Sequence, residues 1–241
     1  MKVIALNGSK RKKYTHGLIE ATAAILATYN IEVEIINLFE YKINECIGCE
    51  VCILHDKCVL NDDTQLIMEK LINSDGIIIA SPVYMENISG KMKTFIDRTC
   101  KWFHRPQVYG KPVLSLVTTK GSGVKKTAMY LNKVALLWGA LNGGTITRGM
   151  STINNPVTKK ECQKFINCML SSNYSPSLKE LSYFQCQKIL AYKTVECDKQ
   201  YWQQKCWNDK AYFIDCKINP IVKLINTGAY KAVVKSKSKK S

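Results

Sequence analysis

The sequence lacks the long apolar runs that membrane insertion requires. None of its apolar runs approaches the roughly 20 residues that cross a bilayer as a helix. The apolar start of the chain turns polar at Asn7, too early for a signal-peptide core of about 7–15 apolar residues. With 46% apolar and 22% charged residues, the composition is that of a folded domain. We therefore expect a cytoplasmic protein without membrane insertion.

Two common nucleotide-binding motifs are also absent. The Walker A pattern G-x-x-x-x-G-K-[ST] fails at Gly90-Lys91, because position 85 is a methionine. The dinucleotide pattern G-x-G-x-x-G fails at Gly121-Ser122-Gly123, which lacks the third glycine. These absences disfavour a nucleoside triphosphate and the usual mode of NAD binding.

Acidic residues are scarce. The chain has 19 aspartates and glutamates against 35 lysines and arginines, which gives a formal net charge of +16. Such a charge favours acidic partners, among them nucleic acid, anionic lipid and phosphorylated cofactors. Part of the excess lies in residues 235–241, a lysine-rich end that predicts a disordered, solvated tail. The charge alone does not choose among these partners.

Strand patterns alternate with helical patterns over residues 1–150. Strands are predicted at residues 2–7, 31–38, 76–80, 112–118 and 144–147. Strands that alternate with helices form βαβ units and a parallel sheet, and five strands suit the doubly wound order 2-1-3-4-5. We therefore predict a flavodoxin-like α/β domain over residues 1–150 and an α-helical C-terminal extension over residues 151–241.

Two loops should meet at the ligand-binding edge of this sheet. In the order 2-1-3-4-5, ligands bind where the carboxyl ends of strands 1 and 3 diverge, so residues 8–16 and 81–90 should face one crevice. The first loop joins the hydroxyls of Ser9 and Thr15 to four consecutive basic residues, Lys10–Lys13, just before a helix. A helix N-terminus with such donors is a natural phosphate site. The alternative is a solvated loop or a nuclear-localisation-like patch.

The second loop has a different chemistry. It offers the aromatic ring of Tyr84, the apolar bulk of Val83 and backbone groups held by Pro82. These groups suit a flat heteroaromatic ring better than a second phosphate. The alternative is that Tyr84 is an ordinary core residue.

Four of the eleven cysteines lie in one short segment, residues 44–62. They are spaced C-x2-C-x2-C-x5-C, as Cys46, Cys49, Cys52 and Cys58. Cytosolic thiols are kept reduced, so disulfides are not expected. Three interpretations stay open: a [4Fe–4S] cluster held by four thiolates, a zinc site, or free and redox-active thiols. The spacing favours the cluster, because zinc sites more often use two separated C-x2-C pairs.

These motifs together resemble a known family. GSKRKKYT after the first strand, CIGCEVC in the cysteine segment and SPVYMENISGKMKTFIDR after the third strand are similar to the NADPH-dependent FMN reductase superfamily. They resemble most its iron–sulfur flavoprotein branch. The resemblance covers residues 1–150 and implies FMN as cofactor, NAD(P)H as donor and a [4Fe–4S] cluster on the four cysteines. It also implies a homo-oligomer in which cluster and flavin meet across subunits.

The resemblance assigns residues to the flavin. It implies that the phosphate lies in the first loop, the ring lies on the second, and the loop after the fourth strand closes the site. The cofactor-binding residues expected on this basis are Ser9, Arg11, Thr15, Ser81, Pro82, Val83, Tyr84, Asn87, Thr118, Thr119 and Gly121. The first loop departs from the family pattern, since Lys10 replaces a proline and the loop is one residue shorter.

Three functions follow from these patterns. The first is an oxidoreductase that passes electrons from NAD(P)H through FMN to a small-molecule or protein acceptor. The second is an FMN electron carrier without NAD(P)H activity. The third, disfavoured because the basic run lies at a phosphate-binding position, is a zinc-stapled basic protein that binds nucleic acid. No catalytic acid or base is nominated, because the flavin carries the chemistry; His16, His104 and Arg98 are interpreted as structural.

Overall fold

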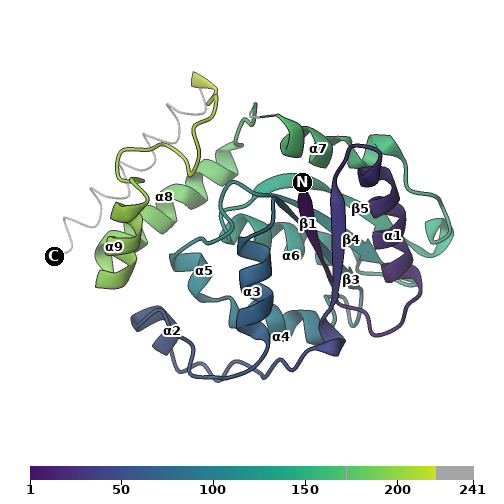
Figure 1. The fold of residues 1–241 in the computed structure, drawn as a ribbon, viewed down its shortest axis with the longest axis horizontal. Coiled ribbons are helices and arrows are strands. Elements are labelled where there is room, and N and C mark those ends of the chain that lie inside the picture. The colour runs from purple at the N-terminus through teal and green to yellow at the C-terminus, as the bar shows by residue number, and fades with distance from the viewer. Residues whose placement is uncertain (172, 221–241) are drawn as a thin grey trace. The chain divides into compact units, whose positions relative to one another are not determined.

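The computed structural model describes residues 1–171 and 173–220. The chain divides into two compact units, Met1–Leu170 and Ser171–Ser241 (Figure 1). The predicted disordered tail, residues 235–241, lies outside the described residues. Within the described part, no helix combines the length and the apolar content needed to cross a membrane.

The first unit is built on a parallel sheet. Its strands in the described residues are β1 (Lys2–Asn7), β2 (Glu32–Asn37), β3 (Gly76–Pro82), β4 (Pro112–Thr118) and β5 (Leu141–Arg148). All neighbours pair in parallel, in the order β2-β1-β3-β4-β5. The predicted doubly wound, flavodoxin-like sheet is therefore confirmed. The last strand begins earlier than expected, at Leu141.

Helices cover both faces of this sheet. They are α1 (Tyr14–Ala27), α2 (Val51–Leu54), α3 (Thr64–Ile72), α4 (Gly90–Arg98), α5 (Lys101–His104), α6 (Val124–Leu137) and α7 (Lys159–Leu170), with the 3-10 turns η1 (Leu38–Glu40) and η2 (Met150–Thr152). The segment that follows Ser89 forms two helices, α4 and α5, and not one continuous helix. The break follows Arg98, where Thr99 donates its hydroxyl hydrogen to the carbonyl of Ile96 at 2.7 Å.

The central strand β3 explains how two cores form on one sheet. Ile77 and Ile79 point into one core with residues of α3, α4 and α6, whereas Ile78 and Ala80 point into the other with residues of α1 and α7. The helices lie accordingly on opposite sides of the sheet in Figure 1. Because β3 is buried on both faces, both its alternating sets of side chains are apolar, which explains the continuous apolar run Ile77–Ala80.

Helix α7 belongs to the first unit, whereas the sequence places it in the extension. Its Phe165 is fully buried in the same core as Leu18 of α1. The fit against β5 is close, since a Cβ atom on Gly143 would lie 2.6 Å from Cδ2 of Phe165 and 2.8 Å from the carbonyl oxygen of Val113. The compact unit consequently ends at Leu170, beyond the predicted residue 150.

The second unit is helical in its described part, as predicted. It contains α8 (Leu178–Lys193) and α9 (Glu196–Gln204). Ser177 caps α8 by accepting from the backbone N–H of Glu180, whose carboxylate accepts in return from the N–H of Ser177. Its small core is aromatic, with Phe184, Trp202, Trp207 and Phe213 in mutual ring contact.

An ion pair fixes α7 to the end of β5. The buried Arg148 donates to the carboxylate of Glu161 at 2.8 and 3.1 Å and to the carbonyl oxygens of Asn155 and Pro156. Hydrogen bonds from Arg148 lower the pKa of Glu161 from its ordinary 4.5 to about 2, against a smaller opposing effect of burial. The ion pair therefore stabilises the fold only while Glu161 is ionised.

This pair predicts a pH dependence of stability. Because the pKa of Glu161 is lower in the folded state, its contribution is complete above about pH 4.5 and is lost as the pH falls toward about 2. We expect Glu161→Gln to lower the free energy of unfolding at pH 7 and to flatten its decline between pH 4.5 and 2. Urea unfolding at a series of pH values measures both. The exposed Glu32→Gln is the control, and an unchanged slope in Glu161→Gln would contradict the assignment.

Candidate functional site

The loops after β1 and β3 meet, as predicted from the sheet order. The N–H of Gly8 donates to the carbonyl oxygen of Ala80 at 2.8 Å, and the hydroxyl of Ser89 donates to the carbonyl oxygen of Gly8 at 2.6 Å. A Cβ atom at position 8 would lie 3.0 Å from both Cβ of Met92 and Oγ of Ser89. Glycine at position 8 thus allows the two loops to approach.

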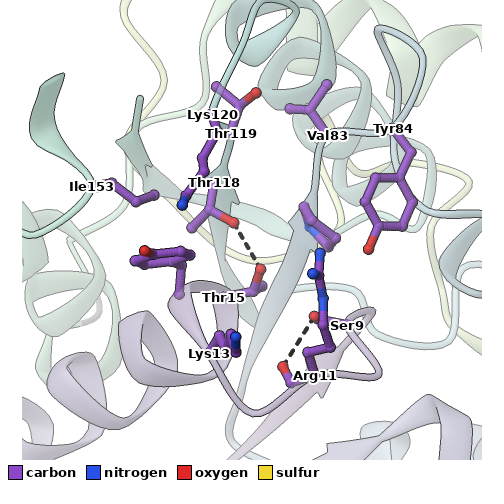
Figure 2. Close-up of a pocket in the computed structure, with 12 residues that line it drawn as sticks. Ser9, Arg11, Lys13, Thr15, Val83, Tyr84, Thr118, Thr119, Lys120 and Ile153 are labelled. Atoms are coloured by element: carbon purple, nitrogen blue, oxygen red, sulfur yellow. Dashed lines mark hydrogen bonds between the residues drawn. The ribbon is translucent and has the colours of Figure 1, made fainter. Parts of the chain in front are cut away.

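A cavity of about 280 Å³ opens where these loops meet. Figure 2 shows Ser9, Arg11 and Thr15 at its base, Val83 and Tyr84 on one side and Thr118–Lys120 opposite them. Eight of the eleven residues predicted to bind the cofactor line it, namely Ser9, Arg11, Thr15, Pro82, Val83, Tyr84, Thr118 and Thr119. The cavity therefore unites three loops that are far apart in the sequence.

One end of the cavity is electropositive. Arg11 and Lys13 line it, and α1 begins directly after them with no acidic residue in its first turn. The hydroxyl of Thr15 is buried there and shares a hydrogen bond of 2.7 Å with the hydroxyl of Thr118 (Figure 2). Ser9 is fixed by Asn7, whose side-chain oxygen accepts from its N–H at 3.0 Å. The positive helix end, two cations and two hydroxyls suit an anionic group.

The other end presents an aromatic ring and apolar side chains. Tyr84 is 46% exposed and lines the cavity, so the alternative that it is an ordinary core residue is wrong. It is held by a tight turn, in which the backbone N–H and carbonyl groups of Tyr84 and Asn87 exchange hydrogen bonds of 2.8 and 3.1 Å. Met85 and Glu86 at the tip have positive φ angles of 47° and 64°. The turn aims Tyr84 at the cavity without burying it.

The loop after β4 closes the third side. The N–H of Val83 donates to the carbonyl oxygen of Thr118 at 2.9 Å, which joins this loop to the one after β3. Gly123 has a φ of +83°, and a Cβ atom there would lie 2.9 Å from Cα of Glu86. The ammonium of Lys120 lies 4.7 Å from the ring centroid of Tyr14, and both residues line the cavity. The loops that form the walls of the cavity are therefore in direct contact with one another.

Three of the predicted cofactor residues do not line this cavity. Ser81 is buried and accepts from the N–H of Ser89; Asn87 closes the turn at Tyr84; Gly121 donates its N–H to the hydroxyl of Thr119. They shape the loops, and their role toward a ligand stays a prediction. Four lining residues were not predicted individually, namely Lys13, Tyr14, Lys120 and Ile153. Lys13 and Tyr14 lie inside the basic motif, but Ile153 follows β5 and no sequence signal indicates it.

The four loop cysteines are not gathered in this structure. Cys46 and Cys49 are exposed, whereas Cys52 and Cys58 are half-buried. Within residues 1–171 and 173–220, no three histidine, cysteine or acidic side chains are placed to hold a metal ion. The thiol of Cys52 instead lies 3.6 Å from that of Cys100, a cysteine outside the motif.

Two buried arginines anchor the cysteine segment. Arg98 donates to the carboxylate of Asp62 at 2.5 Å, to the carbonyl oxygen of Asn44 at 2.9 Å and to the sulfur of Cys58 at 3.4 Å. Arg105 donates to the carbonyl oxygen of Cys52 at 2.6 Å. Burial would raise the pKa of Asp62, but hydrogen bonds led by that from Arg98 lower it to about 2. Arg98 is thus buried in an ion pair that holds the cysteine segment, and the prediction that its role is structural stays a prediction.

Comparison with known proteins agrees with this geometry. Residues 1–155 match the family described as NADPH-dependent FMN reductase. The chain belongs to this family. Two curated proteins of Archaeoglobus fulgidus, each named iron-sulfur flavoprotein, are similar to it. One is 32% identical over 219 residues, covering 85% of this chain and 99% of that protein; the other is 34% identical over 161 residues, covering 66% and 76%.

Solved structures support the fold. The crystal structure of the NADH:FMN oxidoreductase EMOB in its apo form aligns with a TM-score of 0.51 at 19% identity, over 71% of this chain and 91% of that one. The predicted family and fold are thus confirmed, and the chain is a flavin oxidoreductase of the FMN reductase family. NAD(P)H dependence, the acceptor and a [4Fe–4S] cluster stay predictions.

The Arg98–Asp62 ion pair predicts a large stability effect. The side chains are 3% and 0% exposed, so removing the arginine would leave a buried carboxylate without its partner. We expect Arg98→Met to cost about 3–5 kcal/mol of unfolding free energy. The exposed pair of α4 supplies the control, since Lys93→Met should cost less than about 1 kcal/mol. Urea unfolding measures both, and adding Asp62→Asn to Arg98→Met should recover part of the loss.

Proposed function

We propose that this protein is an FMN-dependent oxidoreductase that accepts electrons from NAD(P)H and delivers them to a small-molecule or protein acceptor. The observation that carries the proposal is the cavity itself, which joins a cationic, hydroxyl-lined end to an apolar and aromatic one. A flavin phosphate has the same two parts, a dianionic phosphate and a flat ring. Membership of the FMN reductase family supports the same cofactor.

The electropositive end is the proposed phosphate site. Arg11 is the charged donor, the hydroxyls of Ser9 and Thr15 are the neutral ones, and the N-terminal turn of α1 adds backbone N–H groups and a positive dipole. Lys13 and Lys120 extend the positive potential to the rim. Since the described residues that line this end are basic or carry hydroxyl groups, it favours an anionic group such as a phosphate.

The opposite end is the proposed ring site. Pro82, Val83 and Tyr84 form one wall, and Thr118 and Thr119 form the other. When FMN is bound, it supplies hydride acceptance and electron donation; the protein holds and orients it. The bracing of Val83 on Thr118 keeps the two walls at a fixed separation. No side chain is assigned as a catalytic acid or base.

The cysteine segment is the proposed site of a [4Fe–4S] cluster. Four thiols on one loop are the donor set that such a cluster uses, and relatives that span most of the chain are named iron-sulfur flavoproteins. The described thiols are not gathered, so binding requires the loop to change conformation. A homo-oligomer and a cytoplasmic location complete the proposal.

One alternative function is kept, an FMN electron carrier that does not react with NAD(P)H. The family supports flavin binding for both, so the reaction with the donor decides between them. A zinc-stapled nucleic-acid-binding protein is not favoured, because Arg11 and Lys13 of the basic run line the cavity, at the position expected of a phosphate site.

The phosphate site predicts an asymmetry within the basic run. Arg11 and its neighbour Lys12 are both exposed, but Arg11 lines the cavity and Lys12 does not. We expect Arg11→Gln to weaken FMN binding roughly tenfold or more, since a charged hydrogen bond contributes about 1.5–3 kcal/mol. Lys12→Gln should change it little. Fluorescence titration of FMN into the apoprotein measures both, and equal losses in the two variants would contradict a specific site.

The function is tested on anaerobically purified protein loaded with FMN. We expect NADPH or NADH to bleach the flavin absorbance, with reoxidation on adding a quinone. Flavin that binds but is bleached by neither nucleotide would establish the carrier. A colourless protein that binds DNA with steep salt dependence would overturn both. Iron and zinc analysis of the same sample tests the cysteine site: four irons per chain are expected, and zinc would contradict the cluster.

A further inference from the structure

The thiol pair Cys52–Cys100 lies outside the cofactor cavity and is not part of the four-cysteine motif. Cys52 is on α2 and Cys100 lies between α4 and α5, yet their Sγ atoms are 3.6 Å apart. Among the four motif thiols in the described residues, only Cys52 hydrogen-bonds to another thiol. Both cysteines are half-buried, so neither residue is fully enclosed by the protein.

Side chains of α5 and of the residue that follows it hold the backbone around Cys52 by hydrogen bonds. Arg105, which follows α5, donates to the carbonyl oxygens of Cys52 at 2.6 Å and Ile53 at 3.1 Å. Lys101, at the start of α5, donates to the carbonyl oxygen of Asp56 at 2.8 Å. The segment that carries Cys52 is therefore bound to the segment that carries Cys100.

We propose that Cys52 and Cys100 form a disulfide when the segment holds no metal and a peroxide is present. The Cys52 thiol is first oxidised to a sulfenic acid, which consumes one hydrogen peroxide and releases one water. The Cys100 sulfur then attacks the sulfenic sulfur, forming the S–S bond and releasing a second water. The pair loses two electrons and two protons in total, and the peroxide gains them.

The approach needed is small. A disulfide requires about 2.05 Å between the sulfur atoms, so the thiols must close by about 1.5 Å. Cys46 and Cys49 are exposed, and Cys58 is engaged by Arg98 at 3.4 Å. Cys100 is thus the partner of Cys52 that the geometry favours over the other motif thiols.

This disulfide would act on the metal site. It removes Cys52 from the four-thiolate set, so a segment oxidised in this way cannot hold a four-cysteine cluster. The disulfide and the cluster are then mutually exclusive states of one segment. This consequence rests on the proposed cluster, whereas the disulfide itself does not.

Peptide mapping tests the disulfide directly. Metal-free full-length protein, prepared with a chelator, is treated with hydrogen peroxide, blocked with N-ethylmaleimide and digested with trypsin without reduction. Trypsin cleaves after Lys42, Lys57, Arg98 and Lys101, so residues 43–57 should be found linked to residues 99–101. Fragmentation should place the bond at Cys52 and the maleimide on Cys46 and Cys49. The proposal would be overturned if Cys100 were found alkylated after the peroxide treatment. It would also be overturned if Cys52 were linked to Cys46, Cys49 or Cys58 as often as to Cys100.

Two serine variants serve as a matched pair. Cys49→Ser removes a motif thiol that does not contact Cys100 and should keep the linked peptide. Cys100→Ser should abolish it and leave Cys52 open to a sulfenic-acid probe. Should Cys100→Ser fail to fold, Cys100→Ala replaces it, and the wild-type map decides in either case. Loss of the linked peptide in Cys49→Ser would contradict the specific pair.

A third arm separates this proposal from the cluster. Protein loaded with iron and sulfide is given the same peroxide treatment for a short time, and retained iron is measured beside the peptide map. Protein loaded with iron and sulfide should yield no linked peptide for as long as it retains its iron. A linked peptide in metal-free protein that binds no iron supports the disulfide and overturns the cluster. Iron binding with no linked peptide in the metal-free form overturns the disulfide alone.

Discussion

The candidate site depends on the close approach of two loops, which is held by the hydrogen bond from the N–H of Gly8 to the carbonyl oxygen of Ala80. This bond holds the loop after β1 against the loop after β3, at the point where the sheet reverses its winding. The absence of a Cβ atom at Gly8 permits this approach, because Met92 and Ser89 occupy the space beside it. With the two loops joined there, the cationic end and the aromatic end of the cavity face one another.

The other walls of the cavity are joined to these two loops by hydrogen bonds. Thr15 and Thr118 share a hydrogen bond that ties the first helix to the end of β4, and Val83 ties β4 to the loop after β3. The cavity is therefore a property of three strand ends and not of any one motif. This arrangement suits a protein whose chemistry is supplied by its cofactor, since binding and orientation are what the fold contributes.

The cysteine segment depends on a separate constraint, the two arginines at positions 98 and 105. Their side chains are buried and donate to backbone and carboxylate oxygens of the segment, so it lies against α4 and α5 although its first cysteines are exposed. The same anchoring sets Cys52 opposite Cys100. Arg98 thus holds the ends of the segment and Arg105 holds its middle, while the four motif thiols are not placed to hold a metal ion together.

The sequence by itself determined the sheet, its strand order and the two loops at its edge, because apolar periodicity and loop chemistry are local and the order follows from the winding rule. Eight of the residues that the family resemblance assigned to the flavin line the cavity. Only the tertiary structure decided that α7 packs on the first unit, that Ile153 and Lys120 line the cavity, and that Cys52 meets Cys100. These are contacts between segments far apart in the chain, and neither apolar periodicity nor the winding rule specifies which individual side chains meet.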